Sequence, residues 1–185
     1  ANNVTQSKPY AGALEVLTVL KNKGLKLACV TNKPERFTLP LLQASGLMGF
    51  FEIVVSGDTL AKKKPDPIQL QYICAKFKVM ETEAMLVGDS VTDVKAAHAA
   101  GCYIVTVPYG YNQGRPIDDS QVDATIADLT ELPDDIWALA DTLEQLARDQ
   151  AAQTLVYLDR EITSRVREVT VDVGAWARED VYRLA

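Results

Sequence analysis

The sequence predicts an α/β fold, a Rossmann-like three-layer αβα sandwich with a mostly parallel β-sheet. Short apolar runs alternate with amphipathic segments of about ten residues, which is the pattern of successive βαβ units. Several runs are apolar throughout rather than at every second residue, as expected for strands that are buried on both faces. Glycine and proline residues separate many of these segments and mark where elements end.

Local signals place the elements in order along the chain. Residues 13–23 form an amphipathic helix, with leucines on one face and Gly24 as its C-cap. Pro34 opens the next helix, which ends near Gly46, and Pro40 inside it predicts a kink or an irregular start. The remaining segments predict strands at 25–31, 51–56, 84–87, 102–107 and 124–126, and helices at 68–78, 92–100 and 136–153.

The character of the chain changes toward its C-terminus. The lysines all lie before this part of the chain, whereas five of the eight arginines lie between residues 160 and 183. We therefore expect residues 1–135 to form the α/β core and residues 136–185 to form a C-terminal helix and an atypical extension. The strand-like runs 154–159 and 169–173 lie in this extension, and the sequence leaves their packing open.

Composition and charge exclude several classes of protein. Hydrophobic residues make up 48% and charged residues 24% of the 185 residues, as in ordinary globular domains. The net charge of −6 argues against a nucleic-acid surface, and the basic run 62–64 is interpreted as one functional lysine with solvated neighbours. No apolar stretch reaches the roughly 20 residues that a membrane-spanning helix needs. Cys29, Cys74 and Cys102 follow no metal-binding spacing and are interpreted as buried, reduced thiols of a cytoplasmic protein.

Three short motifs carry the candidate chemistry. Val-Thr-Asn at 30–32 ends one predicted strand, Lys-Pro-Asp-Pro at 64–67 lies in a loop, and Gly-Asp-Ser-Val-Thr-Asp at 88–93 follows another strand. Ligands of an open parallel sheet bind beyond the carboxyl ends of its strands. Thr31 and Asp89 are therefore expected to face one crevice.

The residue types in the first two motifs suit a phosphate group. The Thr31 hydroxyl and the backbone amides of Asn32 and Lys33 can donate hydrogen bonds to phosphate oxygens. Lys64 can neutralise the charge that builds on a transferring phosphoryl group. Each motif also has a structural interpretation: a strand exit with asparagine as a turn former, or an exposed loop in which Asp66 caps the next helix.

The third motif suits a divalent cation. Asp89 and Asp93 lie four residues apart across a strand-to-helix turn. Hard oxygen ligands at such a turn suit Mg²⁺, which binds one or two carboxylates together with water and substrate phosphate. The structural alternative is a helix N-terminus with Ser90 as its cap.

The strings VTNKP, KKKPDP and GDSVTDVKAAHAAG resemble motifs II, III and IV of the haloacid dehalogenase superfamily of phosphatases. Roughly the first 130 residues resemble its phosphoglycolate phosphatase branch. The resemblance implies Mg²⁺-dependent phosphomonoester hydrolysis through an aspartyl-phosphate that water then cleaves. By motif, Thr31 and Asn32 would hold the phosphoryl group and Lys64 would stabilise its charge. Asp89 would bind Mg²⁺, with Asp93 as a second ligand or as support for the first.

The resemblance is incomplete on the N-terminal side. The first motif of the superfamily, an Asp-x-Asp that supplies the nucleophile, does not occur before Thr31, and the helical cap of this branch is missing as well. We therefore expect a C-terminal piece of a longer phosphatase, which lacks the strand between those that end in Thr31 and Asp89. In an alternative circular permutation, Asp159 would be the nucleophile and Glu161 the acid. Otherwise the apolar run before Asp159 only fills the vacated slot or packs elsewhere, and the run 169–173 is an equal candidate to fill the slot.

The favoured function is that of a phosphoglycolate phosphatase, with Mg²⁺ as cofactor and a small phosphorylated metabolite as partner, and with no nucleic-acid or membrane partner. A non-catalytic module that binds phosphate and metal, and a sugar phosphomutase, are the alternatives. His98 has no counterpart among the catalytic residues and is interpreted as structural or solvated. The 185-residue chain by itself is expected to be inactive, because it lacks the nucleophile.

Overall fold

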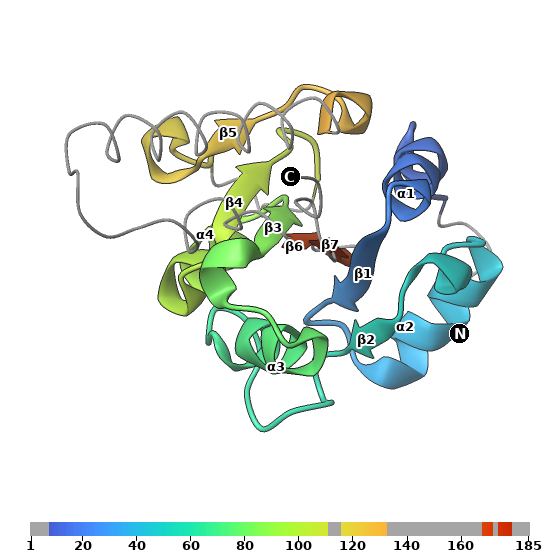
Figure 1. The fold of residues 1–185 in the computed structure, drawn as a ribbon, viewed down its shortest axis with the longest axis horizontal. Coiled ribbons are helices and arrows are strands. Elements are labelled where there is room, and N and C mark those ends of the chain that lie inside the picture. The colour runs from blue at the N-terminus through green and yellow to red at the C-terminus, as the bar shows by residue number, and fades with distance from the viewer. Residues whose placement is uncertain (1–7, 111–115, 133–167, 172–173, 179–185) are drawn as a thin grey trace, which may run out of the picture.

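The computed structural model describes residues 8–110 and 116–132 in full, and the backbone of residues 168–171 and 174–178. Helices and strands alternate along the first of these ranges, as the sequence predicts (Figure 1). The helices are α1 (Ala13–Asn22), α2 (Glu35–Ala44), α3 (Ile68–Phe77) and α4 (Val91–Ala100). The strands are β1 (Leu25–Val30), β2 (Ile53–Val55), β3 (Met85–Gly88), β4 (Tyr103–Thr106), β5 (Ala124–Thr125), β6 (Glu168–Val171) and β7 (Gly174–Arg178).

The strands of the described residues form one sheet in the order β2-β1-β6-β7-β3-β4-β5. β1 pairs in parallel with β2, and β4 pairs in parallel with both β3 and β5. β6 is parallel to β1 and to β3, whereas β7 runs antiparallel to its neighbours. The predicted α/β class with a mostly parallel sheet is confirmed.

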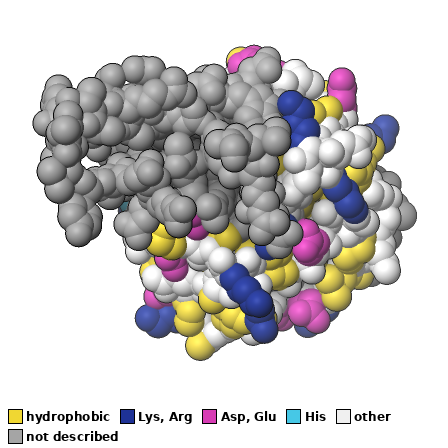
Figure 2. Space-filling view, viewed as in Figure 1, with side chains coloured by type: hydrophobic (Ala, Val, Ile, Leu, Met, Phe, Trp, Pro, Cys, Tyr) yellow, Lys and Arg dark blue, Asp and Glu magenta, His cyan; other side chains and the backbone are white. Residues whose placement is uncertain are grey.

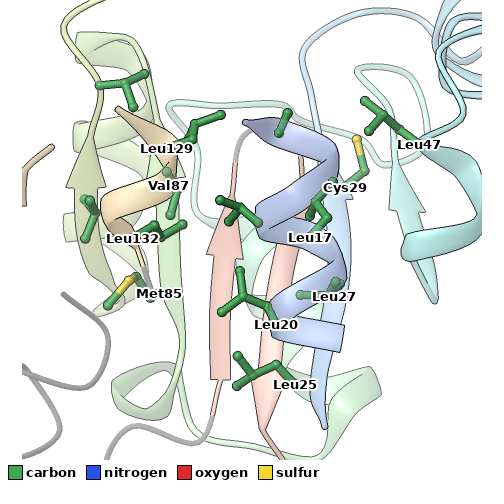
Figure 3. Close-up of a cluster of buried hydrophobic side chains, with 14 of the residues drawn as sticks. Leu17, Leu20, Leu25, Leu27, Cys29, Leu47, Met85, Val87, Leu129 and Leu132 are labelled. Carbon is green, nitrogen blue, oxygen red and sulfur yellow. The ribbon is translucent and has the colours of Figure 1, made fainter. Parts of the chain in front are cut away.

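Helices cover both faces of the sheet, which confirms the three predicted layers (Figure 1). Along β1, Leu27 and Cys29 pack into the core beneath α1 and α2, whereas Ala28 and Val30 pack into the core beneath α3 and α4. Figure 3 shows the first of these cores, with leucine side chains of α1 directed at the strands. Because both faces are buried, the alternation of side chains along each strand leaves no polar stripe in the sequence.

The element boundaries differ from the predicted ones in a few places. Helix α2 runs through Pro40 as one element, which removes one backbone donor without ending the helix. The strand predicted at 51–56 is shorter, since β2 spans only Ile53–Val55, and Met48–Phe50 forms a 3₁₀ turn ahead of it. Three expectations fall outside the described residues: the helix 136–153, the run 154–159 and the boundary between residues 135 and 136.

The slot between β1 and β3 is occupied by the β6–β7 hairpin. Val171 of β6 is aligned with Cys29 of β1 and with Val87 of β3, both in parallel. The figures show the two strands between β1 and β3 (Figures 1 and 3). The run predicted at 169–173 therefore supplies a strand to the slot, whereas Asp159 and Glu161 lie outside the described residues.

The structure also bears on the cysteines, on His98 and on the charged surface. All three cysteines are free and buried, as predicted, and His98 on α4 is exposed. Burial raises the pKa of the Cys29 thiol to about 12. Cationic and anionic side chains are interspersed over the described part of the face in Figure 2. Within the described residues, no helix combines the length and the apolar character that crossing a bilayer requires.

Candidate active site

The turn after β1 presents the first motif at the carboxyl edge of the sheet. The Thr31 amide donates to the Val55 carbonyl at 2.9 Å, which continues the pairing with β2 for one residue. The chain then turns, and the Lys33 amide donates to Thr31 Oγ1 at 3.2 Å. Thr31 Oγ1 keeps its own proton for a further acceptor. The turn therefore offers a hydroxyl donor where a ligand of a parallel sheet is expected.

Asn32 links the first motif to the second. Its Nδ2 donates to the Lys64 carbonyl at 2.8 Å. Its Oδ1 is buried and has no hydrogen-bond partner among the described residues. The side chain of Asn32 therefore fixes the loop that carries Lys64, which goes beyond the turn-forming role that its residue type suggests.

Lys64 is the buried member of the basic run, and its two neighbours are solvated, as predicted. Its residue is 3% exposed, and its Nζ lies 2.8 Å from Asp93 Oδ1 and 3.2 Å from the Val30 carbonyl oxygen. Lys62 and Lys63 are exposed, and Lys62 pairs with Asp66 at the surface. The Lys64 ammonium therefore lies at the end of β1, beside the turn that carries Thr31.

Asp93 uses both carboxylate oxygens within the protein. Oδ1 pairs with Lys64, and Oδ2 accepts hydrogen bonds from the Asp89 amide at 3.2 Å, the Ser90 amide at 3.0 Å and Ser90 Oγ at 2.6 Å. Ser90 is the N-cap of α4, as the structural alternative predicts, and Asp93 completes a capping box by accepting from the Ser90 amide. This geometry favours support of Asp89 and Lys64 over direct metal ligation by Asp93.

Asp89 lies at the end of β3 and lines a pocket together with Thr31, as the strand-end argument predicts. The backbone of Gly110 packs so closely against Asp89 that a Cβ on this glycine would collide with the carboxylate. Tyr10 lines the same pocket as Asp89. Burial raises the pKa of its hydroxyl, and the negative charge of Asp89 raises it further.

The pocket has a volume of about 300 Å³. Thr31, Asp89 and Lys33 form what we call its polar end, and most of its lining surface is apolar. The lining residues are Lys8, Pro9, Tyr10, Ala13, Cys29, Thr31, Lys33, Thr38, Leu41, Leu42, Ser45, Leu47, Asp89 and Leu129. Lys64 and Asp93 lie behind this surface, in contact with each other.

A divalent cation fits the donors at the polar end. Asp89 offers carboxylate oxygens in the pocket that contains Thr31. Among the described residues, no three potential metal-ligating side chains gather in one place. Mg²⁺ often binds through one or two carboxylates, with water and phosphate oxygens as its remaining ligands. The described donors therefore suit Mg²⁺ bound together with a phosphate, rather than an ion held in a protein cage.

Gly57 and Gly88 hold the site backbone at close range. A Cβ on Gly57 would collide with the backbone carbonyl of Asn32, and a Cβ on Gly88 would collide with the side chain of Asp93. The Gly57 amide also donates to the Lys33 carbonyl at 2.8 Å. The loop after β2 therefore packs directly against the turn that carries Thr31.

Gly57→Ala is expected to destabilise the fold by about 1 to 3 kcal/mol, because the new methyl group meets backbone that has no rotamer to change. Urea unfolding measures the change. Gly49→Ala is the matched control, since a Cβ at Gly49 meets no atom within 4 Å. Equal losses of stability in the two variants would contradict the packing described for Gly57.

Sequence patterns missed the residues that support the site. Gln69 accepts from Lys64, Gly110 packs against Asp89, and Tyr10 lines the same pocket as Asp89, but all three lie outside the three motifs. Gly110 follows the fourth predicted strand, so its position at a strand end was the available signal. Gln69 gave no signal, because a glutamine beside apolar helix positions reads as solvent-facing.

The chain is similar to known proteins over much of its length. The model of the haloacid dehalogenase-like hydrolase family matches residues 1–107. A phosphoglycolate phosphatase of Thiobacillus denitrificans is 50% identical over 125 residues, which cover 68% of this chain and 55% of that protein. The corresponding protein of Nitrosococcus oceani is 47% identical over 131 residues, which cover 71% and 58% of the two chains.

Solved structures show the same relationship. A crystal structure of a predicted phosphoglycolate phosphatase from Haemophilus somnus has a TM-score of 0.66 and 38% identity, over 68% of this chain and 56% of that one. A putative β-phosphoglucomutase from Thermotoga maritima has a TM-score of 0.60 and 30% identity, over 67% and 57% of the two chains. The chain spans just over half the length of these relatives. The chain belongs to the haloacid dehalogenase-like hydrolase family.

Proposed function

We propose that the whole protein is a Mg²⁺-dependent phosphomonoester hydrolase, with 2-phosphoglycolate as the favoured substrate. The observation that carries the proposal is that three motifs, far apart in sequence, meet at one carboxyl edge of the sheet. Thr31 and Asp89 line one pocket, and Lys64 lies beneath Thr31. The similarity to phosphoglycolate phosphatases supports the substrate. The three free cysteines support a cytoplasmic location.

Each residue of the candidate site has a defined task in this proposal. The Thr31 hydroxyl and the backbone amide of Asn32 donate to phosphoryl oxygens. The Lys64 ammonium places a positive charge behind these two donors. Asp89 holds Mg²⁺, and Asp93 keeps Asp89 and Lys64 in place through its two oxygens. Mg²⁺, when bound, neutralises charge on the phosphoryl oxygens.

The attacking group is proposed to be an aspartate of a first motif in the whole protein. Its carboxylate oxygen forms a bond to phosphorus while the ester oxygen leaves and takes up a proton. Water then cleaves the aspartyl-phosphate and releases inorganic phosphate. The described residues take part by binding and orienting the phosphoryl group.

The test is release of phosphate by the whole protein from a panel of small phosphomonoesters. The proposal expects turnover with Mg²⁺, loss of turnover with EDTA, and the highest kcat/KM with 2-phosphoglycolate. Transfer of phosphate between sugar phosphates without net release would favour a phosphomutase, in line with the similarity to a putative β-phosphoglucomutase. Binding of phosphate without any turnover would favour the non-catalytic module.

The 185-residue chain by itself is expected to release no phosphate above background, because none of its three motifs supplies a nucleophile. Two aspartates outside these motifs are tested as alternative nucleophiles. Asp159 belongs to the permutation considered from the sequence, and Asp172 directly follows β6 in the sequence. Mg²⁺-dependent turnover by the purified chain that is abolished by Asp159→Asn or by Asp172→Asn would contradict this prediction.

A further inference from the structure

Gln69 is a fully buried polar side chain at the start of α3. It has 0% exposure, and both ends of its amide are used. Its Nε2 donates to the Ser56 carbonyl at 2.9 Å, and its Oε1 accepts from the Lys64 amide at 3.3 Å. The Ser56 carbonyl needs a donor and the Lys64 amide needs an acceptor. The primary amide of glutamine supplies both without burying a charge. Gln69 therefore ties the end of β2 to the backbone of Lys64.

The backbone of Lys64 is held on both sides. Gln69 accepts from its amide, and Asn32 donates to its carbonyl at 2.8 Å. The other end of the Gln69 amide contacts Ser56, the residue before Gly57, and Gly57 donates to the Lys33 carbonyl. These contacts form a closed circuit from the turn after β1, through the end of β2 and Gln69, to Lys64 and back to Asn32.

The circuit determines where the Lys64 ammonium lies relative to the Thr31 turn. The side chain of Lys64 ends in a buried contact with Asp93, so a displacement of the Lys64 backbone disturbs the position of the ammonium. The carbonyl of Val30, which precedes Thr31, accepts from the same ammonium at 3.2 Å. A change at Gln69 is therefore transmitted to the charge behind the phosphate donors.

We propose that Gln69 is a positioning residue for phosphate binding, which acts by fixing the backbone of Lys64 against the end of β2. The inference rests on the proposed function of Thr31, Asn32 and Lys64. Gln69 lies outside the three motifs. The inference assigns it a role in phosphate binding in addition to its role in packing α3 against the sheet.

The experiment measures the affinity of the 185-residue chain for inorganic phosphate, in the presence of Mg²⁺, for Gln69→Met and Gln71→Met. Gln71 lies on the same helix and is exposed, so its substitution makes the same chemical change without touching the circuit. Gln69→Met is expected to weaken binding about tenfold or more, as loss of a supporting hydrogen-bond partner does elsewhere. Gln71→Met is expected to bind like the unmodified chain.

A second control separates positioning from stability. Ile73 is buried on α3, and Ile73→Val is expected to lower stability without touching the circuit. Its phosphate affinity is expected to stay unchanged, and the NMR signals of the Lys64 amide and Nζ are expected to shift only in the Gln69 variant. If Gln69→Met does not fold, Gln69→Leu takes its place, with Gln71→Leu as the matched control.

The outcomes are distinguishable. If the unmodified chain binds phosphate and the folded Gln69 variant binds it equally well, the positioning role is overturned and the phosphate site stands. If Ile73→Val weakens binding as much as the Gln69 variant, the effect belongs to stability and the inference is likewise overturned. If the unmodified chain binds no phosphate, the inference is overturned together with the phosphate site assigned to this chain, and turnover by the whole protein tests the proposed function separately.

Discussion

Lys64→Met is expected to destabilise the folded chain by about 3 to 5 kcal/mol, because it leaves a buried carboxylate without its cation. Lys64 Nζ and Asp93 Oδ1 lie 2.8 Å apart, and both side chains are only 2% exposed. The remaining hydrogen bonds of Asp93 come from neutral groups and do not replace the lost charge. Urea unfolding at neutral pH measures the loss of stability.

Two further variants isolate the cause of this loss. Lys62→Met removes an ion pair of the same kind from the surface, where the side chains of Lys62 and Asp66 are 69% and 28% exposed, and is expected to cost less than about 1 kcal/mol. Asp93→Asn in the Lys64→Met background removes the unpaired charge and is expected to restore part of the stability. An unchanged stability of Lys64→Met, or a double variant no more stable than the single one, would contradict the buried pair.

Asp89→Asn in the whole protein is expected to lower kcat/KM for phosphomonoester hydrolysis by about a hundredfold or more. A divalent cation contributes several kcal/mol to stabilising the charge of the transition state, and each 1.4 kcal/mol corresponds to a factor of ten. Asp89 is the carboxylate that lines the same pocket as Thr31. Steady-state kinetics at varied Mg²⁺ concentration measure the loss.

Asp58→Asn is the matched control for this prediction. Asp58 is exposed and accepts from the Glu35 amide at the start of α2, a bond that asparagine can also accept. Its kinetic constants are expected to stay near those of the unmodified protein. Undiminished turnover of the Asp89 variant would exclude Asp89 as the metal ligand and remove the main support for the proposed mechanism.

Several features of the site were predictable because they depend on local pattern. Continuous apolar runs predict strands that are buried on both faces, and ligands bind beyond the carboxyl ends of such strands. Thr31 and Asp89 therefore fall beside one pocket as expected. The motif around Lys64 predicts it as the functional lysine of its run, and the structure shows that it is the buried one. The run itself does not show which lysine is buried.

The partners of these residues were not predictable from pattern. The pair between Lys64 and Asp93 joins a loop to a helix that lie far apart in the chain, and only the packed sheet brings them together. Gln69 lies among apolar helix positions, and its burial depends on two backbone groups from other segments. The strand in the slot beside β1 likewise depends on long-range pairing, so the sequence left more than one candidate for it.

The most direct test of the site is titration of the 185-residue chain with inorganic phosphate in the presence of Mg²⁺, by calorimetry, for the unmodified chain and for Thr31→Val. The valine keeps the shape of the side chain and removes the hydroxyl donor, and a hydrogen bond to a charged group contributes about 1.5 to 3 kcal/mol. Thr18→Val, on the exposed face of α1, is the control.

Phosphate is predicted to bind to the unmodified chain and to Thr18→Val, and to bind Thr31→Val about tenfold or more weakly, since each 1.4 kcal/mol is a factor of ten. Absence of phosphate binding to the unmodified chain, or equal binding to all three, would contradict the assignment of the Thr31, Lys64 and Asp89 cluster as a phosphate and metal site.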